Sequence, residues 1–157
     1  MLRLTTFLFI SWTSASFSQS FLPAGGRSNS LSNASVAFSD AWSFHHNPGA
    51  LAGVTKRSFG ISYENRFLIK ELQSQAIVYV HPIKTGVLSV GGQLFGFSQF
   101  QRHRIGAGYS MWLSKKLAAG VQLNYQGISF NENYGSKNIL TAECGILASI
   151  SDQWKLG

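Results

Sequence analysis

The chain has 157 residues and a net charge of +7, and only 12% of its residues are charged, about half the share of a typical soluble domain. Aromatic residues make up 13% and there are 16 glycines. No run beyond the N-terminus approaches the roughly 20 apolar residues that a membrane-spanning helix needs, so the sequence argues against a helical membrane protein. Because the Lys and Arg residues accompany no nucleic-acid-binding motif and form no compact run, we expect no nucleic-acid partner.

The first 18 residues have the pattern of an export signal. Met1 to Arg3 is a short basic start, residues 4–12 are mostly apolar, and small residues follow as far as Ser18. This predicts a cleaved secretory signal peptide over residues 1–18, with Gln19 as the first mature residue. An amphipathic or buried segment is the alternative.

Residues 19–55 have a different character, rich in Gly, Pro, Ser and Asn. Such punctuation marks turns and irregular backbone, and we expect only short strand pieces here, such as residues 34–38. Irregular backbone at membrane depth survives only inside a lumen or buried in protein. The segment is therefore predicted to be either a plug or a periplasmic lead-in.

From residue 56 to residue 157 the chain alternates apolar and polar residues in runs of about ten or more. The two-residue period predicts strands, here over residues 56–67, 72–81, 86–97, 102–113, 117–130 and 138–150, with a stub from Trp154. The polar positions carry Gly, Gln, Asn and Ser. This pattern is typical of an antiparallel up-and-down transmembrane β-barrel, with the apolar faces toward lipid and the polar faces toward the interior.

The connections are predicted to alternate in length. Those around residues 81–85, 114–116 and 151–153 look tight, whereas those at 67–71, 98–101 and 131–137 look looser, as short periplasmic turns and longer external loops would. A soluble β-sandwich or barrel also alternates, but its strands usually have about five or six residues. We therefore expect an outer-membrane wall.

Six strands and a stub are fewer than the minimum of about eight for a bacterial single-chain barrel. An open sheet would leave unpaired backbone groups in lipid, each at a cost of several kcal/mol. We therefore expect an incomplete barrel, as part of a longer gene product in preference to a barrel closed by several chains.

Three short motifs in the N-terminal segment carry a family resemblance. They occur in a fixed order and comprise Gly26, Arg27, Asn33, Ala34 and Val36, then Asp40 and Trp42, then Asn47, Pro48 and Leu51. This order resembles the start of the PorV/PorQ-like members of the FadL-like outer-membrane β-barrels. Ser32 and Gly49 depart from the family pattern, where Gly and Ala are usual, but keep small residues.

The resemblance implies a fourteen-stranded outer-membrane barrel with an N-terminal hatch. Family members include components of type IX secretion and channels for fatty acids and hydrocarbons. We therefore expect a protein connected with secretion, with outer-membrane lipid and possible secretion-system proteins as partners. A FadL-like passive channel for a hydrophobic ligand and a structural orphan barrel are the alternatives.

Five charged residues on predicted inner faces or mouths are candidates for pairing across the lumen, holding the plug or contacting a ligand: Glu64, Arg66, Arg102, Arg104 and Glu143. Adjacent His45 and His46 make a poor metal site, because neighbouring side chains point apart in extended backbone. No nucleophile elbow accompanies the Ser, His and Asp residues. We expect no enzyme activity, no cofactor and no metal, and the single Cys144 is interpreted as a small buried or lipid-facing residue.

Overall fold

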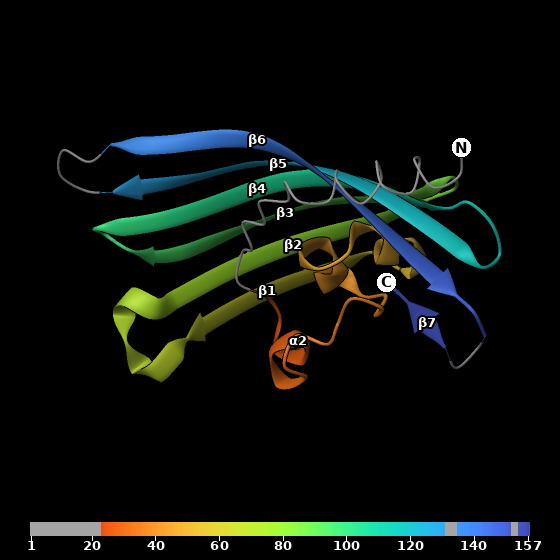
Figure 1. Cartoon of the computed structure of the whole chain (residues 1–157), viewed down its shortest axis with the longest axis horizontal. Coiled ribbons are helices and arrows are strands. Elements are labelled where there is room, and N and C mark those ends of the chain that lie inside the picture. The colour runs from red at the N-terminus through yellow and green to blue at the C-terminus, as the bar shows by residue number, and fades with distance from the viewer. Residues whose placement is uncertain (1–22, 131–134, 152–153) are drawn as a thin grey trace, which may run out of the picture.

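A computed structural model describes residues 23–130, 135–151 and 154–157 (Figure 1). They form one antiparallel sheet of seven strands, in which each strand pairs with its neighbours in sequence, in the order β1 to β7. The sheet is not closed: β1 and β7 are its two edges. The all-β, up-and-down, incomplete-barrel architecture predicted from the sequence is confirmed. The predicted signal peptide, residues 1–18, lies outside the described residues.

The strand bounds follow the sequence pattern closely. The strands are β1 (Ser58–Asn65), β2 (Gln73–Ile83), β3 (Gly86–Phe97), β4 (Phe100–Trp112), β5 (Leu117–Phe130), β6 (Ser136–Ser149) and the short β7 (Lys155–Leu156). Two single-turn 3₁₀ helices, η4 (Arg66–Leu68) and η5 (Lys70–Leu72), connect β1 to β2. No helix among the described residues is long and apolar enough to cross a membrane.

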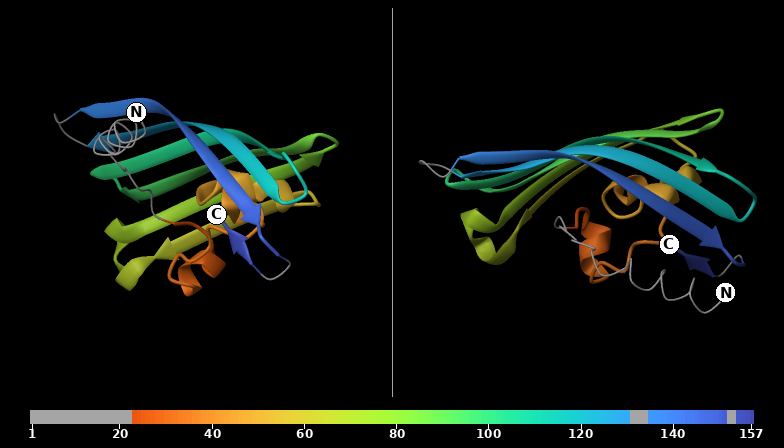
Figure 2. Two further views of the ribbon diagram at one scale, coloured as in Figure 1. Left: turned by 45° about the vertical axis from the view of Figure 1, so that its right-hand side comes forward. Right: turned by 45° about the horizontal axis from the view of Figure 1, so that its top comes forward.

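The N-terminal segment, here residues 23–57, contains short helices and no strand. It holds α2 (Gly26–Ser30), η2 (Ala41–His45) and η3 (Pro48–Gly53), and the strand piece expected at residues 34–38 is absent. The sheet is strongly curved, and Figure 2 shows η2 and η3 lying against its concave face. This is the position that a plug would occupy.

The sheet is inverted relative to a soluble protein. On its convex face the side chains are mostly apolar and exposed, with Ile61 74% and Leu123 59% accessible. On its concave face Gln93, Gln122 and Asn124 are almost fully buried. In a water-soluble fold the apolar face would be covered and the polar face exposed, so the burial pattern is the reverse of the usual one.

One strand departs from the predicted arrangement of faces. The sequence places the Ala76, Val78 and Val80 face of β2 toward lipid, but these residues are buried on the concave side, beneath the N-terminal segment. The convex side of β2 carries Ile77 and Tyr79 instead. Both faces of β2 are apolar because one meets Phe44 of η2 and the other is the outer face, so alternation alone does not orient it.

The predicted alternation of loop lengths is also wrong at one place. The turn after β3 was expected to be loose, but only Ser98 and Gln99 separate β3 from β4. The turn between β2 and β3 is equally short, since only Lys84 and Thr85 separate the strands. Loop length therefore does not distinguish the two ends of this sheet.

Two small apolar clusters join the N-terminal segment to the seven-stranded sheet, which we call the wall. In one, Phe44 and Leu51 pack with Val78, Val80 and Val87. In the other, Ala50 and Ala52 of η3 pack on Ala118 of β5 and Leu147 of β6. Both clusters lie on the concave face, so the apolar core of this chain is the contact between segment and sheet.

Candidate functional site

The interface between the N-terminal segment and the concave face is built around Asn47. Its side-chain oxygen accepts a hydrogen bond from the backbone N–H of Gly49 at 3.0 Å and so caps η3. Its amide nitrogen donates to the carbonyl of Val36 at 3.0 Å and to that of Ile146 on β6 at 2.9 Å. One side chain thus begins a helix, fixes the preceding loop and attaches both to the wall.

Pro48 and Gly49 touch the wall without an intervening side chain. A Cβ atom added at Gly120 of β5 would overlap the backbone of Pro48, and one at Gly145 of β6 would overlap Asn47 and Gly49. Ser110 donates from Oγ to the carbonyl of Pro48 at 2.5 Å. Glycine in these strands therefore permits a close backbone approach, which a larger residue would prevent.

Trp112 also serves this interface. Its indole N–H donates to the carbonyl of Ala52 at 2.8 Å, the residue next to the end of η3. The register places Trp112 on the concave side together with Ser110. Its polar tip therefore satisfies a helix-end carbonyl that would otherwise lack a partner.

Two aromatic rings of η2 pack directly against glycines on the concave face of the sheet. A Cβ atom at Gly60 of β1 would meet the Trp42 indole at 2.9 Å, and one at Gly91 of β3 would meet the Phe44 ring at 2.8 Å. Phe44 is completely buried. The inner glycines of four strands thus form shallow seats that match the shape of the segment.

Arg27 and Asp40, two residues of the N-terminal motifs, hold the segment together internally. Asp40 caps η2, accepting from the backbone N–H of Trp42 at 2.9 Å, and its carboxylate lies 3.5 Å from the Arg27 guanidinium. The same guanidinium lies 4.0 Å above the centre of the Phe38 ring. Asp40 is thereby committed to a structural role.

The remaining motif residues shape the backbone of the segment. Ser32 and Asn33 have φ angles of 51° and 70°. Both therefore adopt the left-handed backbone conformation, which glycine adopts most easily. Gly26 starts α2, Ala34 follows the left-handed pair, and Leu51 is fully buried in η3. The motif residues therefore converge on one folded unit and its seat.

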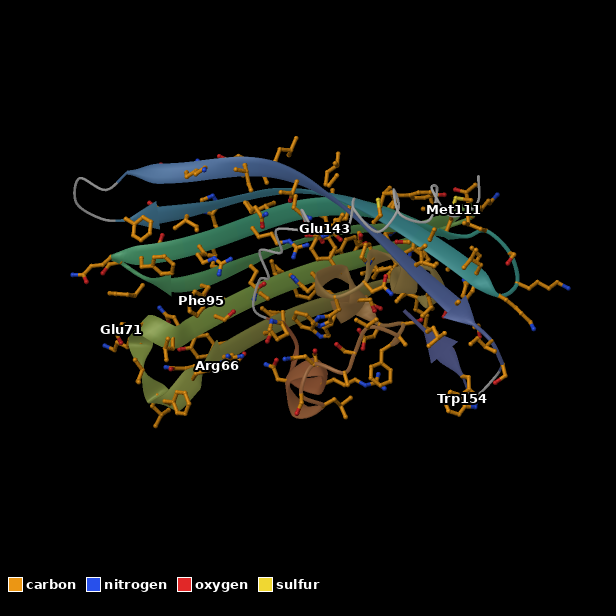
Figure 3. All side chains as sticks on the ribbon, viewed as in Figure 1. Arg66, Glu71, Phe95, Met111, Glu143 and Trp154 are labelled. Atoms are coloured by element: carbon orange, nitrogen blue, oxygen red, sulfur yellow. The ribbon has the colours of Figure 1, made fainter. Side chains whose placement is uncertain are left out.

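An ion pair between a buried Arg and a half-exposed Glu crosses the concave face beside η2. Arg104 of β4, only 5% exposed in its side chain, donates from Nη2 to Glu143 of β6 at 2.6 Å. In the amide orientation that satisfies both ends, Gln122 accepts from Arg104 at 2.9 Å and donates to the carbonyl of Phe44 at 3.1 Å. Figure 3 shows Glu143 reaching inward from β6. This network joins three strands of the sheet, β4, β5 and β6, to η2.

A second polar group lies near the far end of β1. Glu64 accepts from Asn29 of α2 at 2.8 Å and pairs with Arg66 at 2.7 Å. Arg102 is half-buried on the concave side of β4. Of the five predicted charged residues, the structure therefore pairs Arg104 with Glu143 and Glu64 with Arg66, in two separate places.

His45 and His46 belong to the segment rather than to a strand. His45 stacks with Trp42 and meets Phe44 edge-on, and burial lowers its pKa from 6.5 to about 3, assisted by the nearby charges of Arg104 and His46 and opposed by the backbone of Ile77. Burial also lowers the pKa of His46, whose Nε2 lies 3.0 Å from the carbonyl of Ala24. His45 is thus a neutral packing residue near pH 7.

The contacts described above hold the N-terminal segment against the sheet. Among residues 23–130, 135–151 and 154–157, no group of three or more His, Cys, Asp or Glu residues lies close enough to hold a metal. Asp40 bonds within its own segment while His45 is enclosed by aromatic rings. Cys144 is exposed on the convex side of β6.

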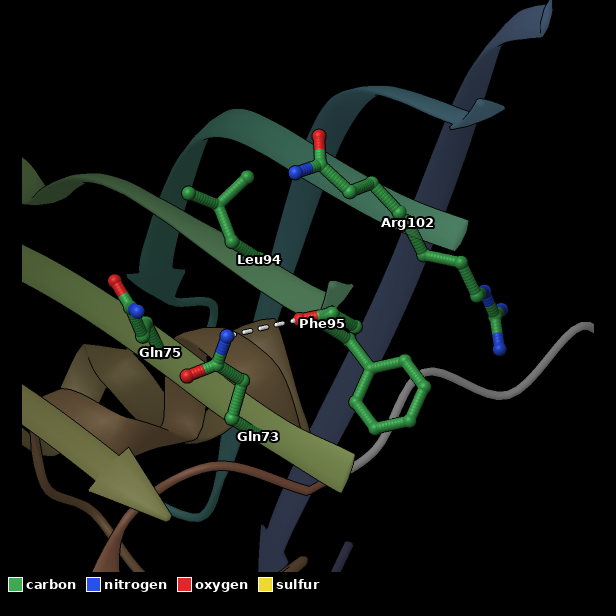
Figure 4. Close-up of a pocket in the computed structure, with 7 residues that line it drawn as sticks. Gln73, Gln75, Leu94, Phe95 and Arg102 are labelled. Carbon is green, nitrogen blue, oxygen red and sulfur yellow. Dashed lines mark hydrogen bonds between the residues drawn. The ribbon is translucent and has the colours of Figure 1, made fainter. Parts of the chain in front are cut away.

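Two cavities lie next to the sheet, one between strand ends and one beside the N-terminal segment. One of about 110 Å³, shown in Figure 4, lies between β2, β3 and β4, where Gln73 donates to the carbonyl of Gly96 at 3.2 Å. The other, of about 510 Å³, lies between the N-terminal segment and β6 and is lined by Val36, His46, Asn47, Pro48, Glu143, Cys144, Gly145, Ile146 and Gly157. Only the second falls within the usual range of about 300–1,000 Å³ for ligand pockets.

The chain matches no protein-family model, no curated protein and no solved structure. The site is therefore defined by its geometry. Sequence reasoning places Gly, Ser and Gln on the inner face, where Gly allows neighbouring elements to approach closely. It did not identify the individual close approaches at Gly60, Gly91, Gly120 and Gly145, or the polar contacts of Ser110 and Gln122. Their only signal was that Gly, Ser and Gln alternate with apolar residues on the inner face.

Proposed function

We propose that this chain forms wall strands of an outer-membrane β-barrel whose lumen holds the N-terminal segment, and that this barrel serves protein export, as its PorV/PorQ-like motifs suggest. The observation that carries the proposal is the inverted sheet, with exposed apolar side chains on the convex face and buried polar ones on the concave face. Lipid is the solvent in which an exposed apolar face is stable. A cleaved signal peptide at residues 1–18 would direct the chain to that compartment.

A barrel in lipid must pair the edges of its sheet. In the described residues β6 has a strand partner on its outer edge only at Ala148 and Ser149, where it meets β7, and β1 has none beyond β2. Unpaired backbone groups in hydrocarbon cost several kcal/mol each. We infer that further strands, from the same polypeptide or from partner chains, pair with these edges.

The character of the concave face favours export over passage of hydrophobic molecules. Away from the two apolar clusters, the buried inner side chains include Gln93, Arg104, Asn124 and Gln126, which are polar or charged. A channel for fatty acids or hydrocarbons needs an apolar lining, since such ligands gain nothing from hydrogen-bonding groups. The segment is also bound to the wall by several hydrogen bonds and two apolar clusters.

The proposal is tested by fractionation and gene deletion. The protein should sediment with outer membranes, and deletion should leave exported proteins in the periplasm, with release restored by the wild-type gene. Complementation by Gly120→Val, which is expected to unseat the segment, should restore release less well than complementation by Gly26→Ala. Unchanged secretion in the deletion strain would reject the export role.

The FadL-like channel remains a second candidate because of the 510 Å³ cleft beside β6. Val36, Pro48 and Ile146 supply apolar surface there, close to an edge of the sheet. If this cleft admits a hydrophobic ligand, deletion should reduce uptake of labelled fatty acid or aromatic hydrocarbon while leaving secretion intact. Uptake at the wild-type rate would remove this candidate.

A further inference from the structure

Six basic residues gather at one end of the sheet, although they are dispersed in the sequence. Lys56 and Arg57 precede β1, Lys84 is in the turn between β2 and β3, and Lys155 begins β7. Lys115 and Lys116 lie between β4 and β5. The antiparallel register places the start of β1, both turns and the start of β7 at the same end. We call these six residues the basic rim, which is the right-hand end of the sheet in Figure 1.

The basic rim has no counter-charge within the described part of the chain. All six side chains belong to exposed residues. The ion pairs among the described residues involve Arg27, Arg66 and Arg104 instead, and the described acidic residues Asp40, Glu64, Glu71 and Glu143 all lie elsewhere. Asp152, which lies in the sequence between β6 and β7 and outside the described residues, offsets at most one of these six charges. The remaining positive charges repel one another, so the rim favours an anionic partner.

The opposite end of the sheet is different. There Arg66 pairs with Glu64, and Lys70 has Glu71 beside it in the connection from β1 to β2. Lys137 lies near the start of β6. Among the described residues, the excess of positive over negative charge is therefore larger at the basic rim than at the opposite end.

Amphipathic aromatic residues lie beside the basic rim. Tyr109 donates from its hydroxyl to the carbonyl of Thr85 in the β2–β3 turn at 2.9 Å, and the Tyr79 hydroxyl lies 3.2 Å from Nδ1 of His81. Trp154, labelled at this end in Figure 3, is 69% exposed. Tyr and Trp with an apolar body and a polar tip are characteristic of the headgroup level of a membrane.

From this arrangement we propose that the basic rim binds the phosphate headgroups of anionic phospholipids in the leaflet that it adjoins. The inference rests on the proposed membrane function and adds the lipid class and the residues that recognise it. The apolar convex face ends where the basic rim begins, so the Lys and Arg heads lie at the depth of the phosphates. Long basic side chains reach that layer while their stems stay against apolar surface.

The experiment uses the full chain, diluted from denaturant into vesicles of phosphatidylcholine alone or of phosphatidylcholine with phosphatidylglycerol. Co-sedimentation gives the membrane-bound fraction, at low and at raised salt. The wild type should bind the phosphatidylglycerol vesicles more tightly, and salt should remove the difference because exposed charges are screened. This comparison needs no variant.

Matched double variants locate the effect. Lys115→Gln with Lys116→Gln should reduce the preference for phosphatidylglycerol by roughly tenfold, since each basic residue near an anionic surface contributes to attraction. Lys70→Gln with Lys137→Gln, at the other end, removes the same charge and should leave the preference within about twofold of wild type. Both pairs are exposed, and equal binding to neutral vesicles shows that folding is intact.

The outcomes separate this inference from the function on which it rests. Failure to bind either kind of vesicle contradicts the membrane function and the inference together. Equal binding to both kinds at low salt overturns only the lipid inference, and leaves the basic rim to an acidic protein. An equal loss of preference in both double variants also overturns it, because the attraction would then follow net charge alone.

Discussion

At the scale of single residues, His45 is a histidine kept neutral by its surroundings. It is enclosed by Trp42 and Phe44 near the positive charge of Arg104, and its pKa is lowered from 6.5 to about 3. The unfolded or undocked segment therefore binds a proton below about pH 6.5 that the docked segment does not bind. Docking is fully stable above this pH and weakens as the pH falls toward 3.

This sign leads to a pH prediction. At about pH 5 the wild-type segment should be less stably docked than at neutral pH by about 2 kcal/mol, seen as faster amide hydrogen exchange in residues 41–53. His45→Gln should reduce that pH dependence and leave the part that the lowered pKa of His46 contributes. The matched control, His81→Gln, alters a half-buried histidine of β2 away from this contact and should keep the wild-type profile. A wild-type exchange rate that is constant between neutral pH and about pH 5 would contradict the prediction.

At the scale of elements, the strands were more predictable than the segment that covers them. The two-residue period located all six long strands because each strand carries apolar residues at alternate positions. This alternation is a local property of the sequence. The sequence did not predict that Asp40 and Asn47 cap helices. The position of Asn47 is fixed in part by its hydrogen bond to Ile146, which is 99 residues away in the chain. Such contacts depend on tertiary structure.

The wrong orientation of β2 has the same origin. Val78 and Val80 are inner residues because Phe44 and Leu51 provide an apolar partner there, whereas most inner positions of β4 to β6 are polar or glycine. The sequence of β2 alone does not reveal that partner. Among the charged residues, the Arg104–Glu143 pair likewise depends on the β4–β5–β6 register, which sets the distance between the two side chains.

The seats for η3 give a prediction at this scale. Gly120→Val should displace Pro48 and lose the hydrogen bonds around η3, because the added atoms meet main chain that has no room to move. We expect docking of the segment to weaken by about 2–3 kcal/mol, measured as increased protease cleavage within residues 23–57. Gly26→Ala, where an added Cβ has no neighbour within 4 Å, is the matched control and should remain protected.

Protease cleavage of the strands, measured in the same experiment, distinguishes a loss of docking of the segment from a failure of the sheet to fold. If the wall folds and only the segment becomes sensitive to protease, the glycine acts through docking. If Gly120→Val leaves the segment as protected as in Gly26→Ala, the close approach of Pro48 to β5 is not what holds it, and the role assigned to this glycine is wrong.

At the scale of the whole molecule, the inverted sheet decides which environment stabilises the chain. Leu123 lies in the middle of β5 on the convex face and is 59% exposed. In water, replacing an exposed Leu by a charged residue is nearly neutral or improves solubility. In lipid the same change places a charge in hydrocarbon, at a cost of about 2–4 kcal/mol near the bilayer midplane.

Leu123→Lys therefore distinguishes a membrane wall from a water-soluble sheet. We expect it to lower the stability of the vesicle-inserted protein by about 2–4 kcal/mol, measured by denaturant titration in neutral vesicles. The matched control is Thr141→Lys, on the concave side of the adjacent β6, where a charge meets polar surroundings and should cost about 1 kcal/mol or less. Equal effects of the two substitutions would mean that the convex face does not meet lipid, because only a bilayer makes one face of the sheet so much less tolerant of charge.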